Sequence, residues 1–130
     1  VHLANRTAAR AQALRDQFGQ RRQVVSWQDI EALLPRVDLL VNTTSLGMKG
    51  QPPLQVDVGA LRPDAVVADL VYVPLATELL KDARARGFKT ADGLGMLLHQ
   101  AVRGFDLWFG QRPQVTPELR ALVEADLAAA

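Results

Sequence analysis

Two nearly continuous apolar runs constrain the fold of this chain most. Residues 37–42 read VDLLVN, and residues 66–70 read VVADL. Runs with so few polar positions are typical of strands that are covered on both faces, as in parallel sheets. Segments with apolar residues at helical spacing lie between and beyond these runs, joined by short connections. This alternation predicts a doubly wound α/β fold, a mostly parallel sheet with helices on both faces.

Further elements follow from local signals. Short strands are expected at residues 1–4, 24–25 and 88–90, and Ser26 with Asp29 resembles a capping box. Residues 45–63 are too rich in glycine and proline for an assignment. The expected helices cover residues 7–18 before Gly19, a short stretch before Pro35, residues 75–86 before Gly87, residues 94–109 and residues 116–127.

Composition excludes several classes of function. The chain has 130 residues, of which 15 are basic and 14 acidic, so its net charge is +1. This balance does not favour nucleic acid or a membrane surface as a partner. The absence of cysteine excludes disulfides, a thiolate zinc site and a cysteine nucleophile. No apolar run approaches the roughly 18 residues of a membrane span, and we expect no metal site.

The loops that follow the strands are the candidate ligand-binding segments, because parallel sheets bind ligands at the carboxyl ends of their strands. Four loops qualify: residues 5–7, 42–49, 72–74 and 91–95. In the first, Arg6 and Arg10 are four residues apart with no carboxylate beside them. Two arginines there can bind the 2′-phosphate of a dinucleotide, with Thr7 and the helix N-terminus adding donors. The alternative is that Thr7 only caps the helix and both arginines are solvated.

The other three loops each have a functional and a purely structural interpretation. Residues 42–48 can line a ligand trough or form a turn that satisfies its own backbone. Tyr72 ends a strand and can contact a substrate or fill the core. Gly93 and Gly95 let backbone approach a flat ligand, Met96 can press on a ring or pack in the core, and Gln100 follows in the helix. His99 has no partner carboxylate nearby in sequence, so we interpret it as a core or surface residue.

Four stretches together carry a family resemblance: NRTAAR, DLLVNTTSLGM, ADLVYVPLATELL and GFKTADGLGMLLHQAVRGFDLWFG. In order and spacing they resemble the C-terminal half of the shikimate dehydrogenases, over essentially the whole chain. The resemblance implies a Rossmann-like fold and a cytoplasmic enzyme of aromatic amino-acid biosynthesis. That enzyme uses NADP to interconvert 3-dehydroshikimate and shikimate.

The resemblance also assigns roles to individual residues. Tyr72 and Gln100 match substrate-binding positions. The matches to cofactor-binding positions are Asn5, Arg6, Thr7, Arg10, Thr44, Ser45, Leu70, Gly93 and Met96. The first four of these surround the 2′-phosphate in the family. Leu70 stands where the family often has methionine.

The chain departs from the family pattern in what it lacks. The family has a strand and a glycine-rich phosphate turn before the position of Val1, and the 130 residues contain neither. The family's catalytic lysine and aspartate belong to a substrate domain that these residues do not include. We therefore expect a fragment with no catalytic residues: a partial NADP-binding domain at residues 1–92, then terminal helices at residues 93–130. Alone, it is expected to bind cofactor weakly, to be inactive and to self-associate through an exposed sheet edge or helices.

Two other functions stay open at this stage. One is a quinate/shikimate dehydrogenase paralogue; NAD-preferring members carry an acid near the position of Arg6, so the arginine favours NADP. The other is a nucleotide-binding module that has lost catalysis. The retained NRTAAR stretch, Tyr72 and Gln100 argue against such a loss.

Overall fold

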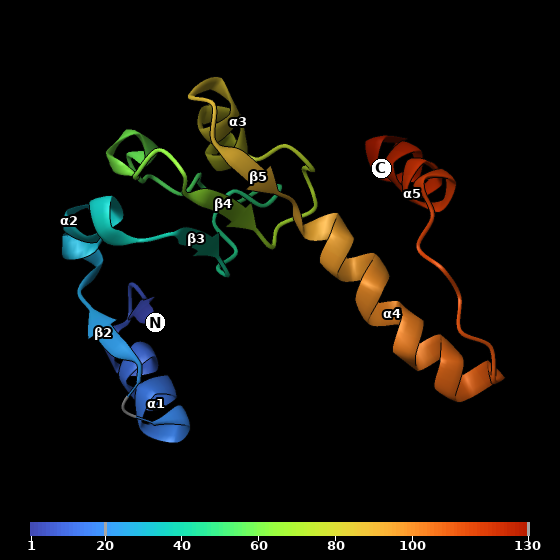
Figure 1. Cartoon of the computed structure of the whole chain (residues 1–130), viewed down its shortest axis with the longest axis horizontal. Coiled ribbons are helices and arrows are strands. Elements are labelled where there is room, and N and C mark those ends of the chain that lie inside the picture. Colours follow the sequence, from blue (N-terminus) through green and yellow to red (C-terminus); the bar gives the residue numbers. More distant parts are fainter. Residues whose placement is uncertain (20, 130) are drawn as a thin grey trace.

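The computed structural model describes residues 1–19 and 21–129, and Figure 1 shows the course of the chain. Strands and helices alternate through most of the sequence. The strands are β1 (His2–Ala4), β2 (Gln23–Val25), β3 (Leu39–Asn42), β4 (Val66–Asp69) and β5 (Lys89–Ala91). The α-helices are α1 (Ala8–Phe18), α2 (Ile30–Leu33), α3 (Glu78–Ala85), α4 (Gly93–Phe109) and α5 (Pro117–Ala129). Three 3₁₀ turns are η1 (Trp27–Asp29), η2 (Leu34–Arg36) and η3 (Val58–Ala60).

All strand pairs are parallel, as predicted, but the described strands form two sheets. β1 pairs with β2, and β3, β4 and β5 form a second sheet in that order. Within the described residues, β1 pairs with no strand but β2 and β3 with none but β4. Each of them therefore leaves one edge of backbone hydrogen-bonding groups without a strand partner.

The hydrophobic core belongs to the three-stranded sheet and the elements on one of its faces. Val67 of β4 and Leu80 of α3 are completely buried, and Leu34 of η2 and Val58 of η3 complete the same cluster. Figure 1 shows α3 lying over β4 and β5. On the other face of β3, Leu39 and Val41 are half exposed, so in the described chain this sheet is covered on one face only, contrary to the expectation from its apolar run.

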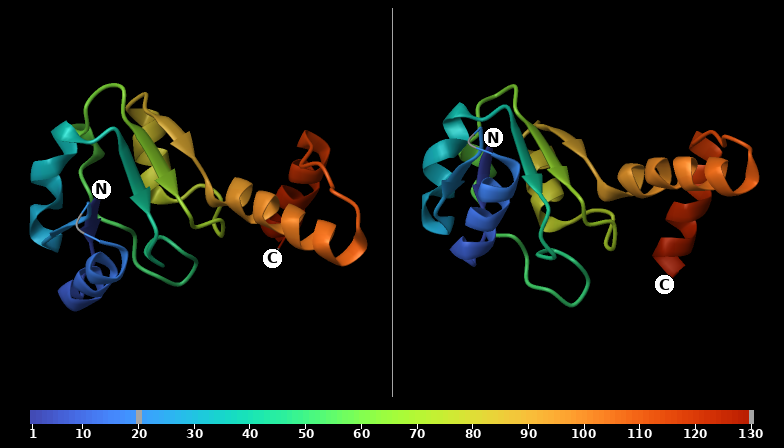
Figure 2. Two further views of the ribbon diagram at one scale, coloured as in Figure 1. Left: turned by 60° about the horizontal axis from the view of Figure 1, so that its bottom comes forward. Right: turned by 90° about the horizontal axis from the view of Figure 1, so that it is seen from below.

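The two C-terminal helices extend away from the sheet. α4 follows β5 and runs outward from the sheet. After it the chain turns back, so that α5 lies near the beginning of α4 (Figures 1 and 2). Leu107, Trp108 and Phe109 at the far end of α4 are largely exposed, and only the first residues of this helix, Gly93 and Leu94, are buried. The predicted apolar face of this helix is thus present but mostly uncovered.

Most local predictions agree with the structure, but a helix start, a helix cap and the burial of a helix face differ. α3 begins at Glu78 rather than Leu75, because Thr77 caps it. Ser26 donates its hydroxyl to the Asp29 carboxylate (2.8 Å) and makes no backbone capping bond, so the predicted capping box is wrong. The apolar face predicted for α1 is mostly unburied, since Leu14 and Phe18 are 45% and 55% exposed. Residue 130, the last of the predicted terminal segment, lies outside the described residues.

Candidate functional site

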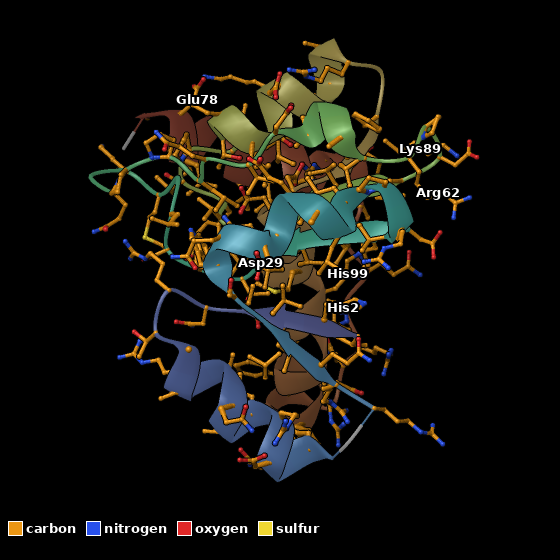
Figure 3. The ribbon with its side chains drawn as sticks, turned by 90° about the vertical axis from the view of Figure 1, so that its left-hand side faces the viewer. His2, Asp29, Arg62, Glu78, Lys89 and His99 are labelled. Atoms are coloured by element: carbon orange, nitrogen blue, oxygen red, sulfur yellow. The ribbon has the colours of Figure 1, made fainter. Side chains whose placement is uncertain are left out.

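The loops predicted to bind ligand lie at one edge of the structure. Because β3, β4 and β5 are parallel, the loops that follow them leave the sheet at the same edge. In Figure 3, His2, Arg62 and Lys89 stand at or just before the beginnings of β1, β4 and β5, and all three lie on the same side of the view. Figure 2 shows β1 running in the same direction as β3 and β4, so its following loop points to the same edge.

The segment after β1 presents free donors at the start of α1. Asn5 accepts a hydrogen bond from the Thr7 backbone N–H (2.8 Å) and shapes the turn. Thr7 occupies the N-cap position, but its hydroxyl makes no capping bond, so the side-chain cap of the alternative interpretation is wrong, whereas its solvated arginines agree with the structure. Arg6 and Arg10 are exposed, and within the described part of the chain neither forms an ion pair. The first turn of α1 holds no acid, so these cations and the helix dipole can act together on an anion.

The loop after β3 uses one of its two predicted side chains internally. The Thr44 hydroxyl donates to Asn42 Oδ1 (2.8 Å) and accepts from the Leu46 N–H (3.1 Å). Those two bonds hold the turn, so Thr44 shapes the loop rather than offering its hydroxyl to solvent. Ser45, in contrast, is exposed at the tip. The structural interpretation of this loop thus applies to Thr44, and Ser45 is the residue that stays available for the ligand-lining interpretation.

The first residue of α4 packs closely against the segment that follows β4, which brings two predicted residues, Leu70 and Gly93, together. A Cβ atom at Gly93 would lie 2.2 Å from the Leu70 carbonyl oxygen and 2.8 Å from that of Val71. Only glycine permits this approach of the helix to the strand end. Tyr72, two residues beyond Leu70, is half buried in the same region. The second sheet therefore places Leu70, Tyr72 and Gly93 at one point of its carboxyl edge.

The first two turns of α4 carry the other predicted residues of this edge. Met96 is 42% exposed, and Gln100 is exposed one turn later on the same face. His99 is also exposed, in agreement with its interpretation as a surface residue. Among the described residues, no hydrogen bond or ion pair links this group to Arg6 or Arg10. The residues of the loop after β1 and the residues at the start of α4 are thus two separate parts of one edge.

Two features of the site were missed by sequence reasoning. Asp92 caps α4 through the Leu94 N–H (3.1 Å) and binds Arg120 of α5 (2.7 Å), which also binds Glu124 (2.7 Å). The hydrogen bond to Asp92 is the main cause that raises the pKa of Arg120 above its ordinary value. An aspartate just before a helix signals the cap, but nothing in the sequence signals its partner 28 residues away. The second feature, the buried Asp69, is described below.

Two cavities accompany these elements. One of about 460 Å³ lies at the carboxyl edge, between Gly47, Lys49, Val73 and Leu127 near the end of α5. A larger one of about 760 Å³ lies beside the beginnings of β1 and β2, with His2 in its wall. The smaller cavity lies at the edge where ligands of parallel sheets bind, but its wall contains none of the predicted site residues and is formed in part by their neighbours in the loops after β3 and β4.

The described part of the chain holds neither a metal site nor a membrane-spanning helix. No group of three histidine, cysteine or acidic side chains is placed to hold a metal ion. No helix there has the length and apolar character to cross a membrane.

Parallel α/β units, a helix N-terminus with free arginines and close backbone approach at the carboxyl edge define the class of protein: this is a Rossmann-like domain. The family model described as "Shikimate 5'-dehydrogenase C-terminal domain" matches residues 93–122. Over 98% of its length the chain is 74% identical to shikimate dehydrogenase (NADP(+)) of Rhodopseudomonas palustris and 71% identical to that of Afipia carboxidovorans. The chain belongs to the shikimate dehydrogenase family, and it spans about half the length (46%) of these curated relatives.

Solved structures agree with this assignment. Quinate dehydrogenase from Corynebacterium glutamicum in complex with NAD has a TM-score of 0.81 and 35% identity, covering 99% of this chain and 46% of that one. Shikimate 5-dehydrogenase from Thermus thermophilus in complex with NADP(H) and shikimate has a TM-score of 0.76 and 30% identity, covering 99% and 45%. The predicted family and fold class are thereby confirmed.

Proposed function

We propose that the natural protein carrying these residues is an NADP-dependent shikimate dehydrogenase, and that this chain supplies much of its cofactor-binding side. NADP, when bound, takes up or delivers the hydride that interconverts shikimate and 3-dehydroshikimate. Identity of 74% with relatives of that name supports the activity. The proposal includes a division of the chain into a cofactor domain, residues 1–92, and terminal helices, residues 93–130. It also includes a cytoplasmic location.

The observation that carries the cofactor choice is the free cationic group after β1. Arg6 and Arg10 are exposed, unpaired within the described residues and next to the unused hydroxyl of Thr7. An adenosine 2′-phosphate brings two negative charges and several acceptor oxygens, which these groups can bind, whereas a 2′-hydroxyl cannot use both guanidinium groups. The residues present therefore fit NADP better than NAD.

The test is to replace Arg6 with alanine in the natural protein and measure KM for NADP and for NAD. Loss of one charge-assisted phosphate contact, about 1.5–3 kcal/mol, should raise KM for NADP by about 10- to 100-fold and leave that for NAD nearly unchanged. Arg21→Ala is the matched control, because this exposed arginine lies between α1 and β2, beyond the opposite end of the helix. Equal losses for both cofactors would exclude the phosphate-binding role.

The roles of the remaining residues form the second part of the proposal. Asn5 shapes the phosphate turn, Ser45 faces the cofactor, and Leu70, Gly93 and Met96 lie at its nicotinamide end. We assign Tyr72 and Gln100 to the substrate. The isolated chain is expected to be inactive and to self-associate through the open edges of β1 and β3, which light scattering of the pure chain can test.

A second candidate is a dehydrogenase that prefers quinate. The likeness to quinate dehydrogenase, at a TM-score of 0.81, is the observation that favours it. Initial rates of the natural protein with shikimate and with quinate, each with NADP and NAD, separate the two. Activity confined to quinate with NAD would replace the first proposal with this one.

A further inference from the structure

All buried polar side chains of the described residues belong to one network between β3, β4 and α3. Asn42, Asp69 and Thr77 are 2%, 1% and 1% exposed. Asp69 is a carboxylate, and no ion pair joins it to a cation in the described part of the chain. Burying a charge is costly unless donors compensate for the lost water. A chain that needed only a filled core would place an apolar residue here.

The Asp69 carboxylate accepts hydrogen bonds from three different segments. Asn42 Nδ2, at the end of β3, donates to it (3.0 Å), and so does the backbone N–H of Val71 just after β4 (3.0 Å). The hydroxyl of Thr77, the N-cap of α3, donates to the other oxygen (2.7 Å). One side chain thus joins the end of β3, the loop after β4 and the first turn of α3.

The network continues from Asn42 into the loop after β3. Asn42 Nδ2 also donates to the Leu46 carbonyl (2.9 Å), while its Oδ1 accepts from the backbone N–H and the hydroxyl of Thr44 (3.0 and 2.8 Å). All hydrogen-bonding positions of the Asn42 amide are therefore used, and no buried side-chain N or O of the described residues lacks a partner. The loops touch at one more point, where the Lys49 N–H donates to the Val73 carbonyl (2.9 Å).

We propose that Asp69 is a positioning residue that couples two ligand-facing loops, residues 43–48 and residues 70–77. This inference rests on the proposed function for its consequence, since Ser45 is assigned there to the cofactor and Tyr72 to the substrate. Asp69 touches neither ligand. It fixes the turn that presents Ser45 and the segment that presents Tyr72, so that both are ordered before a ligand arrives.

The coupling can be measured in the isolated chain by amide hydrogen exchange. Thr77→Val removes the hydroxyl at one end of the network and keeps the shape of the side chain. It should raise exchange of the Thr44, Leu46 and Val71 amides by about tenfold, the equivalent of one lost hydrogen bond. Thr77→Ser restores the hydroxyl and should restore protection. The matched control is Thr116→Val, which removes the comparable cap of α5 at Leu119 (3.2 Å).

A reciprocal variant keeps the test decisive if Thr77→Val does not fold. Thr44→Val removes the opposite end of the network, and by reciprocity it should raise exchange of the Val71 and Leu80 amides. Selective changes at these amides, absent from the Thr116→Val control, support the coupling. A uniform change along the whole chain, or none beyond the mutated turn, overturns it.

An activity measurement in the natural protein then separates the two proposals. Thr77→Val should raise KM for both NADP and shikimate, because both loops lose order together. Thr77→Ser should have KM values close to those of the parent protein. If the parent protein shows no dehydrogenase activity, the proposed function fails, whereas the exchange data still decide the coupling. If the parent is active and only its thermal stability changes in Thr77→Val, the positioning role is wrong.

Discussion

The three-stranded sheet with α3 and the amino-terminal β1–α1–β2 unit have similar sequence signals but different interiors. In the first, Val67 and Leu80 are fully buried in a contiguous core. In the second, Ala11 is the sole buried apolar residue among those that the structure describes, and Leu14 and Phe18 remain about half exposed. An apolar stripe shows which face a helix can bury, but burial also needs a surface opposite that face. In this chain the stability therefore resides mainly in the three-stranded sheet unit.

The sharpest test of this difference compares the same substitution in the two units. Leu80→Ala should lower the free energy of unfolding by about 2–5 kcal/mol, because it leaves a cavity in a packed core. Leu14→Ala, at a position 45% exposed, should cost well under half as much. Urea denaturation followed by circular dichroism measures both. Similar losses for the two variants would show that the amino-terminal unit is packed as tightly as the central one.

A pair of glycines tests how rigidly the α4–α5 arm is joined to the sheet. Gly93→Ala would force a methyl group to 2.2 Å from the Leu70 carbonyl oxygen, and overpacking of this kind costs about 1–3 kcal/mol. Gly104→Ala, in the middle of the same helix, would meet only the Trp108 ring at 3.7 Å and should stabilise by about 0.5–1 kcal/mol through helix propensity. The shifts in melting temperature should have opposite signs. Stabilisation by both would mean that α4 moves freely relative to β4.

The smallest expected effect concerns the ion pair that ties α5 to the beginning of α4. Asp92→Asn keeps the helix cap but removes the charge that faces Arg120, at a distance of 2.7 Å and with Asp92 only 15% exposed. We expect a loss of about 0.5–1 kcal/mol.

Glu78→Gln is the control for this ion pair, since its partner Lys81 is also 2.7 Å away but both side chains are largely exposed. Glu78→Gln should change the free energy of unfolding by too little to measure. Thermal unfolding at low and high salt measures both variants, and an equally small effect of Asp92→Asn would show that the arm is not held by this pair.

Much of the fold could be predicted from local signals. The apolar runs at β3 and β4 identify parallel strands, and Gly19 ends its helix, because such signals act over a few residues. The loops that carry the candidate site could be located for the same reason, since a ligand edge follows from strand direction alone. The errors concern either a side-chain cap or the covering of an apolar face: Ser26 bonds Asp29, the Thr7 hydroxyl makes no cap, and Leu14 stays exposed.

Local sequence patterns were enough to predict the parallel α/β class, the positions of the candidate ligand loops and the cationic character of the loop after β1. Which of the candidate residues are available to a ligand depends on the three-dimensional packing. Thr44 is used within its own loop, Arg6 forms no ion pair with any residue that the structure describes, and Gly93 is required by a strand end 23 residues earlier. Asp69 became a junction for the same reason: its three donors come from segments up to 27 residues away. Hydrogen bonds and close contacts of this kind depend on distances in space, which local sequence patterns do not contain.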